Sequence, residues 1–414
     1  MKKRKKKNKN KKVFILMFLI VGIALGIALI NRESIELQKR EKYNIPKVFF
    51  EGNIWGMSTK TDVRDIWIRY IDGVNMYDTY ASIKVQGTSS LAYEKKNYTI
   101  TLYKDAEHEE KNKIDFGWGK QSKYCLKANW IDKTHARNIV TANLASDIQA
   151  KYGLFETAPN NGTIDGFPVE IYVNGRFLGI YTWNIPKDSW MFNMDEDNPN
   201  HIVFASEGWN ASNLFKGKAN YEDWSVEVGR GDDADLEKLN RLITFVNTSS
   251  DKEFKEDFDQ YLDLDATINY FILMQYAQLS DNIAKNMLLA TYDGKVWYPT
   301  LYDLDTSWGT QWNGKDLMDY EKTNTVYKSK LWSRMVKLYP EEITKRYDEL
   351  KTDYLNKESI MKRFNDFKSE IPDTSFAKEN NRWTGIPGYE YEQIEEFLDT
   401  REPIVDELIN DLTK

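Results

Sequence analysis

The sequence predicts an α+β protein with two lobes, the first rich in β-strands and the second mostly helical. Residues 45–104 show the two-residue alternation that is typical of strands, and residues 168–183 contain an Asn-Gly hairpin signal. From residue 235 onward, apolar residues recur at helical spacing instead. We therefore expect a β-rich lobe over about 45–185 and a helical lobe over about 186–414.

An apolar segment precedes these lobes. The first twelve residues carry nine Lys or Arg residues, and residues 13–30 are uncharged and apolar. At about 1.5 Å per residue, this segment is just long enough to cross a bilayer as a helix. The positive flank places the amino end in the cytoplasm. We expect a basic tail (1–12), an uncleaved transmembrane anchor (13–30) and a stalk (31–44), with residues 31–414 outside the membrane.

A secretory signal peptide would begin in a similar way. Such a peptide usually has a shorter apolar core and a cleavage site of small residues. No such site follows Ile30, which favours the anchor.

Charge and cysteine content narrow the possible partners and compartment. Without the nine positive charges of the tail, the net charge falls from −7 to −16. An acidic domain disfavours nucleic acid as a partner and suits a basic protein. Cys125 is the only cysteine, so no internal disulfide can form. For an external domain this favours a cell surface of the Gram-positive type.

The first lobe is predicted from three local patterns. Residues 82–86 and 98–103 alternate as two strands, joined by a loop that contains Gly87-Thr88-Ser89-Ser90 and ends in Lys95-Lys96. Residues 136–151 repeat apolar side chains at i+4, with Thr134 as a candidate cap and Gly153 as a stop signal. Asn174-Gly175 predicts a type I′ turn within the hairpin.

The second lobe is predicted from helical periodicity. Residues 186–235 are polar and are expected to be rich in loops. An apolar stripe from Ile268 to Leu279 then predicts a helix that ends just before Asp281. Residues 328–365 and 390–412 are expected to form amphipathic helices. The carboxylates then lie at the junction of the lobes, where ligand sites are common.

The segment 281–305 carries the clearest chemical pattern. Asp281 is followed by Asn286 at the spacing D-x4-N, then by a turn at Asp293-Gly294, then by Asp303. This order resembles the catalytic segment of protein kinases, in which one Asp orients the acceptor hydroxyl. There an Asn and a second Asp hold the metal ions, since carboxylate and amide oxygens suit Mg²⁺. The HRD and DFG signatures are absent, so the segment resembles that of an atypical kinase.

The chain also resembles the spore-coat CotH family of atypical kinases from about residue 45 to its end. The resemblance depends on four motifs in order: IKVQGTSSLAYEKKNYTITL (83–102), YCLKANWIDKTHARNIVTANLA (124–145), VEIYVNGRFLGIYTW (169–183), and the Asp281/Asn286/Asp303 segment with DLDTSWG. Two positions depart from the family pattern. Asn184 follows the hairpin where an acidic residue is common, and Tyr302 stands where a Trp is common.

The resemblance implies roles for the residues of the second lobe. Asp281 would orient the substrate hydroxyl and accept its proton, although Ser280-Asp281-Asn282 is also ordinary turn chemistry. Asn286 and Asp303 would be metal ligands. Asp305 would add a second carboxylate or simply cap the next segment. The implied cofactors are ATP with Mg²⁺ or Mn²⁺.

Residues of the first lobe would contact the nucleotide. Lys95, with Lys96 as the second candidate, would neutralise the phosphates, although paired lysines usually lie in solvent. Gly87, Ser89 and Ser90 could surround phosphates with backbone N–H groups, or form an ordinary hairpin loop. Arg137 would contact phosphate or pair with a carboxylate, with Asn138 as an orienting partner.

These patterns predict a membrane-anchored kinase outside the cell membrane that phosphorylates Ser or Thr of a basic surface or coat protein. One alternative is a catalytically silent module that binds cell-wall polymer or partner proteins through aromatics such as Trp183, Trp190, Trp209 and Trp224. A second alternative transfers another group, such as AMP or a sugar-linked phosphate. A glycosidase pair built from Asp281 and Asp303 or Asp305 leaves Asn286 and the Lys95 segment without a role. The scattered histidines argue against a zinc site.

Overall fold

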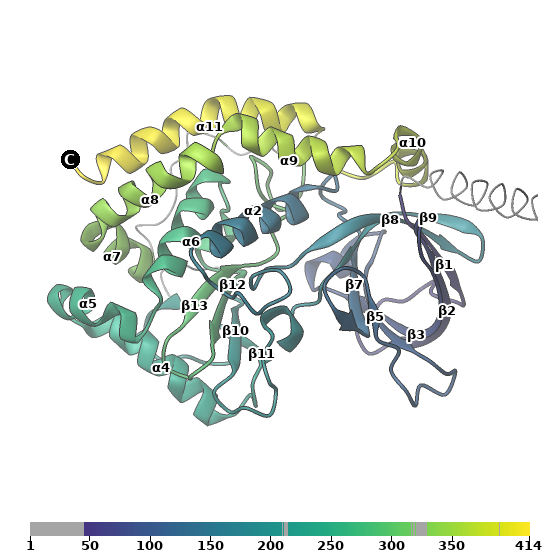
Figure 1. Ribbon diagram of the computed structural model, residues 1–414, viewed down its shortest axis with the longest axis horizontal. Helices are drawn as coiled ribbons and strands as arrows, with labels where there is room; N and C mark the ends of the chain where they lie inside the picture. Colours follow the sequence, from purple (N-terminus) through teal and green to yellow (C-terminus); the bar gives the residue numbers. More distant parts are fainter. Residues whose placement is uncertain are drawn as a thin grey trace, which may run out of the picture.

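The computed structural model describes residues 45–208, 210, 214–315, 317, 319, 329–388 and 390–414. Within these ranges the chain is a mixed α+β protein, as the sequence predicts. A β-barrel lies beside a larger part made of helices and a small sheet (Figure 1). The expected transmembrane segment, residues 13–30, lies outside the described ranges. In the part that is described, no helix has the length and apolar character to cross a membrane.

The barrel is closed by seven strands in the order β1-β2-β3-β4-β7-β9-β8. All neighbours are antiparallel except β1 and β8, which are parallel. The side chains that alternate inward, such as Ile83, Ile100 and Leu126, fill the barrel interior and are fully buried. Its strands are β1 (Lys47–Glu51), β2 (Val63–Ile71), β3 (Met76–Gln86), β4 (Asn97–Tyr103), β7 (Lys123–Lys127), β8 (Gly166–Val173) and β9 (Arg176–Asn184).

The predicted hairpins of the barrel are confirmed. Asn174 and Gly175 have φ values of 48° and 76°, as a type I′ turn between β8 and β9 requires. Between β3 and β4, the Gly87 loop continues into a single 3-10 turn, η1 (Ser89–Ala92). The short strands β5 (Ile114–Asp115) and β6 (Lys120–Gln121) form a separate ribbon.

The larger part is built around a four-stranded sheet of order β11-β10-β12-β13. Its strands are β10 (Ile202–Ser206), β11 (Trp224–Val228), β12 (Met287–Thr291) and β13 (Tyr298–Leu301). The helices are α2 (Arg137–Lys151), α4 (Asp233–Thr248), α5 (Asp251–Asp257), α6 (Leu264–Tyr276), α7 (Lys330–Leu338), α8 (Pro340–Asp353), α9 (Lys357–Ser369), α10 (Asp373–Arg382) and α11 (Tyr391–Asp411). Strands β10 and β11 fall in the stretch 186–235 that was expected to be rich in loops. The helices expected over 136–151, 328–365 and 390–412 are present.

Two helices cross between the barrel and the larger part. Helix α2 lies between β7 and β8 in the sequence, yet it packs against α6 and α9 in the helical core. Helix α10 comes from the C-terminal region, yet it packs on β9 of the barrel (Figure 1). The two parts are therefore interleaved, and residue 185 does not divide them cleanly.

The start of α2 differs from the sequence prediction. Thr134 was expected to cap this helix, but the carboxylate of Asp132 accepts the N–H of Arg137 at 2.9 Å. The Thr134 hydroxyl accepts the N–H of Ala136 outside the helix, at 3.2 Å.

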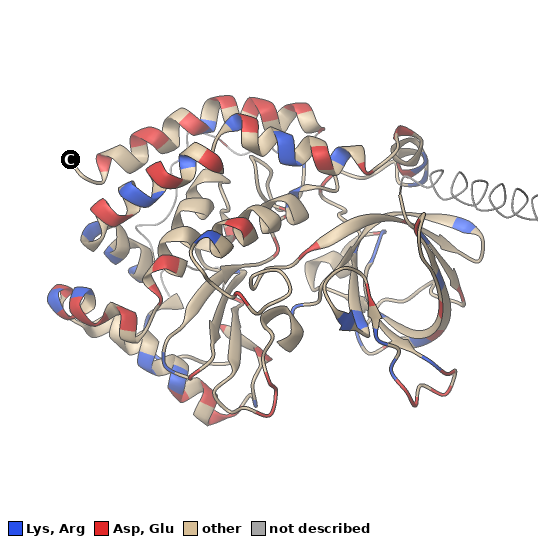
Figure 2. Ribbon diagram, in the orientation of Figure 1, with Lys and Arg blue, Asp and Glu red and all other residues tan. Residues whose placement is uncertain are grey.

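Charged side chains are concentrated on the outer helices, especially α8, α9 and α11, while the sheet strands carry few (Figure 2).

Candidate active site

The Asp281 turn is held in place by aromatic side chains from two helices. Asp281 begins a 3-10 turn, η4 (Asp281–Ile283), shortly after α6 ends. The hydroxyl of Tyr270 in α6 donates to the Asn282 carbonyl at 2.7 Å, and the indole N–H of Trp332 in α7 donates to the Ile283 carbonyl at 3.3 Å. The Tyr270 and Trp332 rings stack, with centroids 5.3 Å apart. Because all these groups are buried, the backbone at Asp281 is firmly positioned.

Ser206, at the end of β10, fixes the other end of this turn. Its hydroxyl donates to the Ala284 carbonyl, and its own carbonyl accepts the Asn286 N–H at 3.2 Å. Asn286 has a φ of 64°, a left-handed conformation that Asn tolerates better than most residues. Its carboxamide makes no hydrogen bond to any residue that the structure describes, so it is available as a ligand.

Asn282 joins the Asp281 turn to the Asp303 segment. Its side chain is fully buried and donates to the Tyr302 carbonyl at 3.0 Å and to the Asn286 carbonyl at 3.4 Å. Asn138 of α2 also holds the Asp303 segment, because its Oδ1 accepts the Leu304 N–H at 3.0 Å. Asn138 therefore connects α2 to the Asp303 segment. The sequence analysis missed the role of Asn282.

The carboxylates of Asp281, Asp303 and Asp305 interact electrostatically. Burial, and then the charge of Asp303, raise the pKa of the Asp281 carboxyl. Burial raises the pKa of the Asp305 carboxyl well above its usual range, and the charges of Asp303 and Asp281 add to this effect. When they are ionised, these carboxylates therefore repel one another, and a bound cation would relieve that repulsion.

The oxygen atoms of Asp303, Asp305 and Asn286 are chemically suited to bind Mg²⁺ or Mn²⁺. Carboxylate oxygens of Asp303 and Asp305 and the free carboxamide of Asn286 are the hard ligands that such ions prefer. Among the described residues, no group of three or more His, Cys, Asp or Glu side chains lies close enough to hold an ion by itself. That finding is compatible with Mg²⁺, which is usually held by one or two carboxylates together with substrate phosphates.

A narrow cleft lies between Asp303 and Asp305 on one side and the loop that joins β3 to β4 on the other, and neither Asp281 nor Asn286 lines it. Its volume is about 30 Å³, which is room for about one water molecule, so a nucleotide requires the walls to separate. The lining residues come from η1, β4, β7, the start of α2 and the Asp303 segment: Ser90, Tyr93, Asn97, Lys127, Asn129, Trp130, Ile131, Asn138, Asp303 and Asp305.

Ser90 and Tyr93 of the Gly87 loop line this cleft, whereas Gly87 itself does not. Gly87 has a φ of 101°, and a Cβ atom there would lie only 1.9 Å from the Ser90 Oγ, so the loop requires glycine. Ser89 is exposed at the start of η1 and does not line the cleft. Lys96 donates to the carbonyls of Leu91 and Tyr93 and so stabilises the η1 turn. Its ammonium is already engaged in structural hydrogen bonds.

Lys95 does not lie where the sequence analysis expected it. Its ammonium is buried and donates to the Ala128 carbonyl at 2.8 Å, to the Ile180 carbonyl, and to Glu379 Oε1 of α10 at 2.6 Å. These contacts use its three N–H donors, and Lys95 does not line the cleft. The assignment of Lys95 to the phosphates is therefore corrected: it stabilises the contact between the barrel and α10.

Arg137 is also structural. Its guanidinium is fully buried and pairs with Asp132 through one terminal nitrogen, while the other donates to Gln393 of α11 at 2.6 Å. Of the two roles left open for Arg137, these contacts support the carboxylate pair. Its assignment to the nucleotide site is corrected for the same reason.

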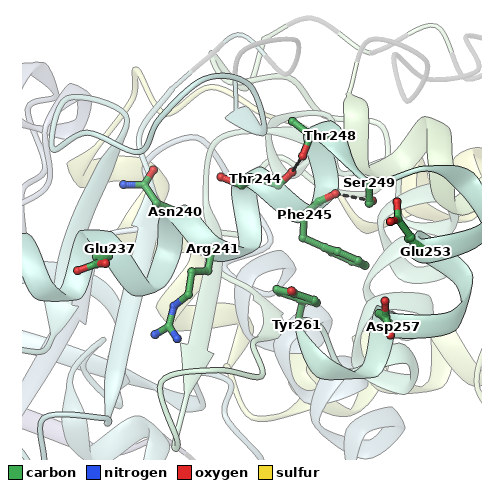
Figure 3. Close-up of a pocket in the computed structure, with 10 residues that line it drawn as sticks. All are labelled: Glu237, Asn240, Arg241, Thr244, Phe245, Thr248, Ser249, Glu253, Asp257 and Tyr261. Atoms are coloured by element: carbon green, nitrogen blue, oxygen red, sulfur yellow. Dashed lines mark hydrogen bonds between the residues drawn. The ribbon is translucent and has the colours of Figure 1, made fainter.

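A larger hollow lies elsewhere. It has a volume of about 580 Å³ and lies along α4 and α5, and Figure 3 shows its lining side chains. Its floor is filled by the stacked rings of Phe245 and Tyr261, whose centroids are 4.0 Å apart. None of the candidate site residues lines it. We therefore place the candidate active site at the smaller cleft, which Asp303 and Asp305 line.

The tryptophans proposed for polymer stacking are mostly unsuited to that role. Trp183 and Trp224 are buried in the cores, with 0% and 1% of their surface exposed. Trp190 is partly buried against both cores. Trp209 lies outside the described residues. The buried pair removes the main support for a polymer-binding surface built from these four side chains.

Comparison with known families identifies the family of this chain. A family model described as CotH kinase protein matches residues 83–405, which is most of the chain. The chain therefore belongs to the CotH kinase family. A search of curated proteins finds no match. The match contains all of the candidate site residues, from Gly87 to Asp305.

Proposed function

We propose that this protein is a kinase that transfers the γ-phosphoryl group of ATP to a Ser or Thr hydroxyl of a protein. Family membership supports a kinase-type enzyme. The observation that supports the proposal most is the electrostatic interaction of Asp281 with Asp303 and Asp305, the two carboxylates that line the cleft, which contributes to raised pKa values for Asp281 and Asp305. Buried carboxylates that repel one another lower the stability of the fold. Such groups are typical of functional sites, where the repulsion serves binding or catalysis.

Asp281 acts as the residue that orients the acceptor. Its carboxylate accepts no hydrogen bond from any described residue, so both oxygens are free for a substrate hydroxyl. The hydroxyl oxygen attacks the γ-phosphorus, the bond from phosphorus to the β–γ bridging oxygen breaks, and ADP leaves. The hydroxyl proton passes to Asp281, whose raised pKa makes it a better acceptor than an ordinary Asp.

Asn286, Asp303 and Asp305 would hold Mg²⁺ or Mn²⁺. A bound ion would neutralise the negative charge of the phosphates. Asn282 and Asn138 keep these residues in register with Asp281, because each connects two of the segments by a buried hydrogen bond. Catalysis depends mainly on this positioning.

The location and the substrate class are supported by sequence alone. Residues 13–30 would anchor the chain, with the kinase outside the membrane, and the net charge of −16 beyond the basic tail favours a basic surface or coat protein. A supply of ATP outside the cell is required by this arrangement.

Metal-dependent nucleotide binding tests the proposal. Isothermal titration calorimetry of the full-length chain should show ATP binding with Mg²⁺ or Mn²⁺ present, and a loss of binding in Asp303→Ala. Labelling with α- and γ-labelled ATP separates phosphoryl transfer from transfer of AMP. Absence of metal-dependent binding in the wild type would contradict the proposal and favour a catalytically silent surface module.

A further inference from the structure

Two lysines near the barrel mouth differ sharply in their hydrogen bonding. The ammonium of Lys95 has each of its three N–H donors occupied, by two carbonyls and by Glu379. The ammonium of Lys127 makes no hydrogen bond to any described residue. Its nearest ion-pair partner is Asp303 Oδ1, at 3.8 Å. Lys127 therefore has donors to offer, whereas Lys95 has none.

The strand pattern places Lys127 at the cleft. In β7, Tyr124 and Leu126 point into the barrel core, so Cys125 and Lys127 lie on the opposite face. Lys127 is the last residue of β7 and lines the cleft together with Ser90, Asp303 and Asp305. Its side chain is only 12% exposed.

Lys187 is the competing cation, and its contacts exclude it from the same role. Its ammonium lies 4.6 Å from the centroid of the Tyr302 ring, and that of Lys127 lies 5.6 Å from the same centroid. Lys187 forms an ion pair with Glu227 at 2.7 Å, however, and it does not line the cleft. Lys127 is the cation that faces both the cleft and the carboxylates.

We propose that Lys127, in place of Lys95, is the lysine that binds the β- and γ-phosphates of the nucleotide. A buried ammonium without hydrogen bonds is unfavourable unless a polar partner arrives. Phosphate oxygens entering the cleft would supply those partners beside Asp303. This inference rests on the proposed kinase function and assigns one of its binding residues.

Calorimetry with a ligand series tests the assignment without measuring turnover. The full-length chain, purified in detergent, is titrated with ATP, AMP and inorganic tripolyphosphate at one fixed Mg²⁺ concentration. Lys127→Met should weaken binding of ATP and tripolyphosphate about 10-fold to 100-fold, as loss of a hydrogen bond to a charged group predicts. AMP binding should change little, because AMP lacks the β- and γ-phosphates.

Lys123→Met is the matched control. Lys123 lies on the same strand and the same face, but it pairs with Asp188 at 2.9 Å and is absent from the cleft lining. This variant should bind all three ligands as the wild type does. Lys127→Arg should retain most of the affinity, and Lys127→Gln replaces the Met variant if the latter does not fold.

The outcomes separate this inference from the proposed function. If the wild type binds no ATP, the kinase proposal fails and this inference fails with it. If the wild type binds ATP and Lys127→Met binds it equally well, only the assignment of Lys127 is wrong. Equal weakening of AMP and tripolyphosphate binding would also overturn the assignment, since the variant would then have distorted the whole cleft.

Discussion

Removing Glu379 should destabilise the protein strongly, because it would leave a buried cation without its partner. The side chains of Lys95 and Glu379 are 0% and 2% exposed, and their charged atoms are 2.6 Å apart. Breaking a buried ion pair by removing one partner costs about 3–5 kcal/mol. Burial already lowers the pKa of Lys95, with Glu379 opposing that shift, so loss of Glu379 makes the charged lysine less favourable still.

Glu379 also completes the edge of β9. Its Oε2 accepts the Ile180 N–H at 2.7 Å, while Lys95 donates to the Ile180 carbonyl. The double variant Lys95→Met/Glu379→Ala removes both charges but still leaves these backbone groups unpaired. We expect it to be about 1–3 kcal/mol less stable than the wild type, which is less than the cost of either single change.

Urea denaturation of the wild type, Glu379→Ala, Lys95→Met and the double variant measures these free energies of unfolding. Each single variant should lose about 3–5 kcal/mol, and the two losses should not add in the double variant. Strictly additive losses, or a cost below about 1 kcal/mol for Glu379→Ala, would refute the reasoning and return Lys95 to consideration as a phosphate ligand.

Three further predictions concern the site itself. Asn282→Ala should lower kcat more than it raises KM and cost about 1–3 kcal/mol in urea, because two carbonyls lose a buried donor; an unchanged kcat would contradict its positioning role. Gly87→Ala should raise KM for ATP, since its Cβ would meet the Ser90 Oγ at 1.9 Å; an unchanged KM would show that the loop adapts freely. Asp305→Asn should raise Tm at neutral pH without metal while weakening Mn²⁺ binding, and a lower Tm would contradict the electrostatic account.

The expected pH dependence of Asp305→Asn follows from the direction of the pKa shift. The pKa of Asp305 is raised above 3.8, so the folded state binds this proton more tightly than the unfolded chain does. Stability therefore falls as pH rises from the unfolded pKa through the folded one. The Tm gain of Asp305→Asn should be largest at neutral pH and should shrink as the pH is lowered.

Local patterns predicted much of the fold correctly. The alternation over residues 82–103 and the Asn-Gly turn depend on neighbours in sequence, and both appear as expected. Strand β10 was missed because all five of its residues, IVFAS, are buried. A strand buried on both faces lacks the alternation that identifies strands.

For the candidate site too, local patterns could be interpreted from the sequence and long-range contacts could not. Asp281, Asn286 and Asp303 lie within one short segment whose spacing could be compared with a known pattern, and the structure holds their segments together through Asn282. Lys95 could not be assigned correctly, because its partners lie 33, 85 and 284 residues away. The sequence analysis did not single out Lys127. It lies in an apolar strand, and the sequence of that strand does not show which residues lie opposite its side chain in the fold.

Label transfer from γ-labelled ATP tests the central claim most directly. The full-length wild type, Asp281→Ala and Asp303→Ala are each incubated with Mg²⁺ or Mn²⁺ and a basic, Ser-rich protein. We expect transfer by the wild type and a loss of at least about 100-fold in each variant, since a positioned general base contributes about 10²–10⁴ to the rate. Transfer that persists in both variants, or no transfer by a wild type that also fails to bind ATP, would contradict the account.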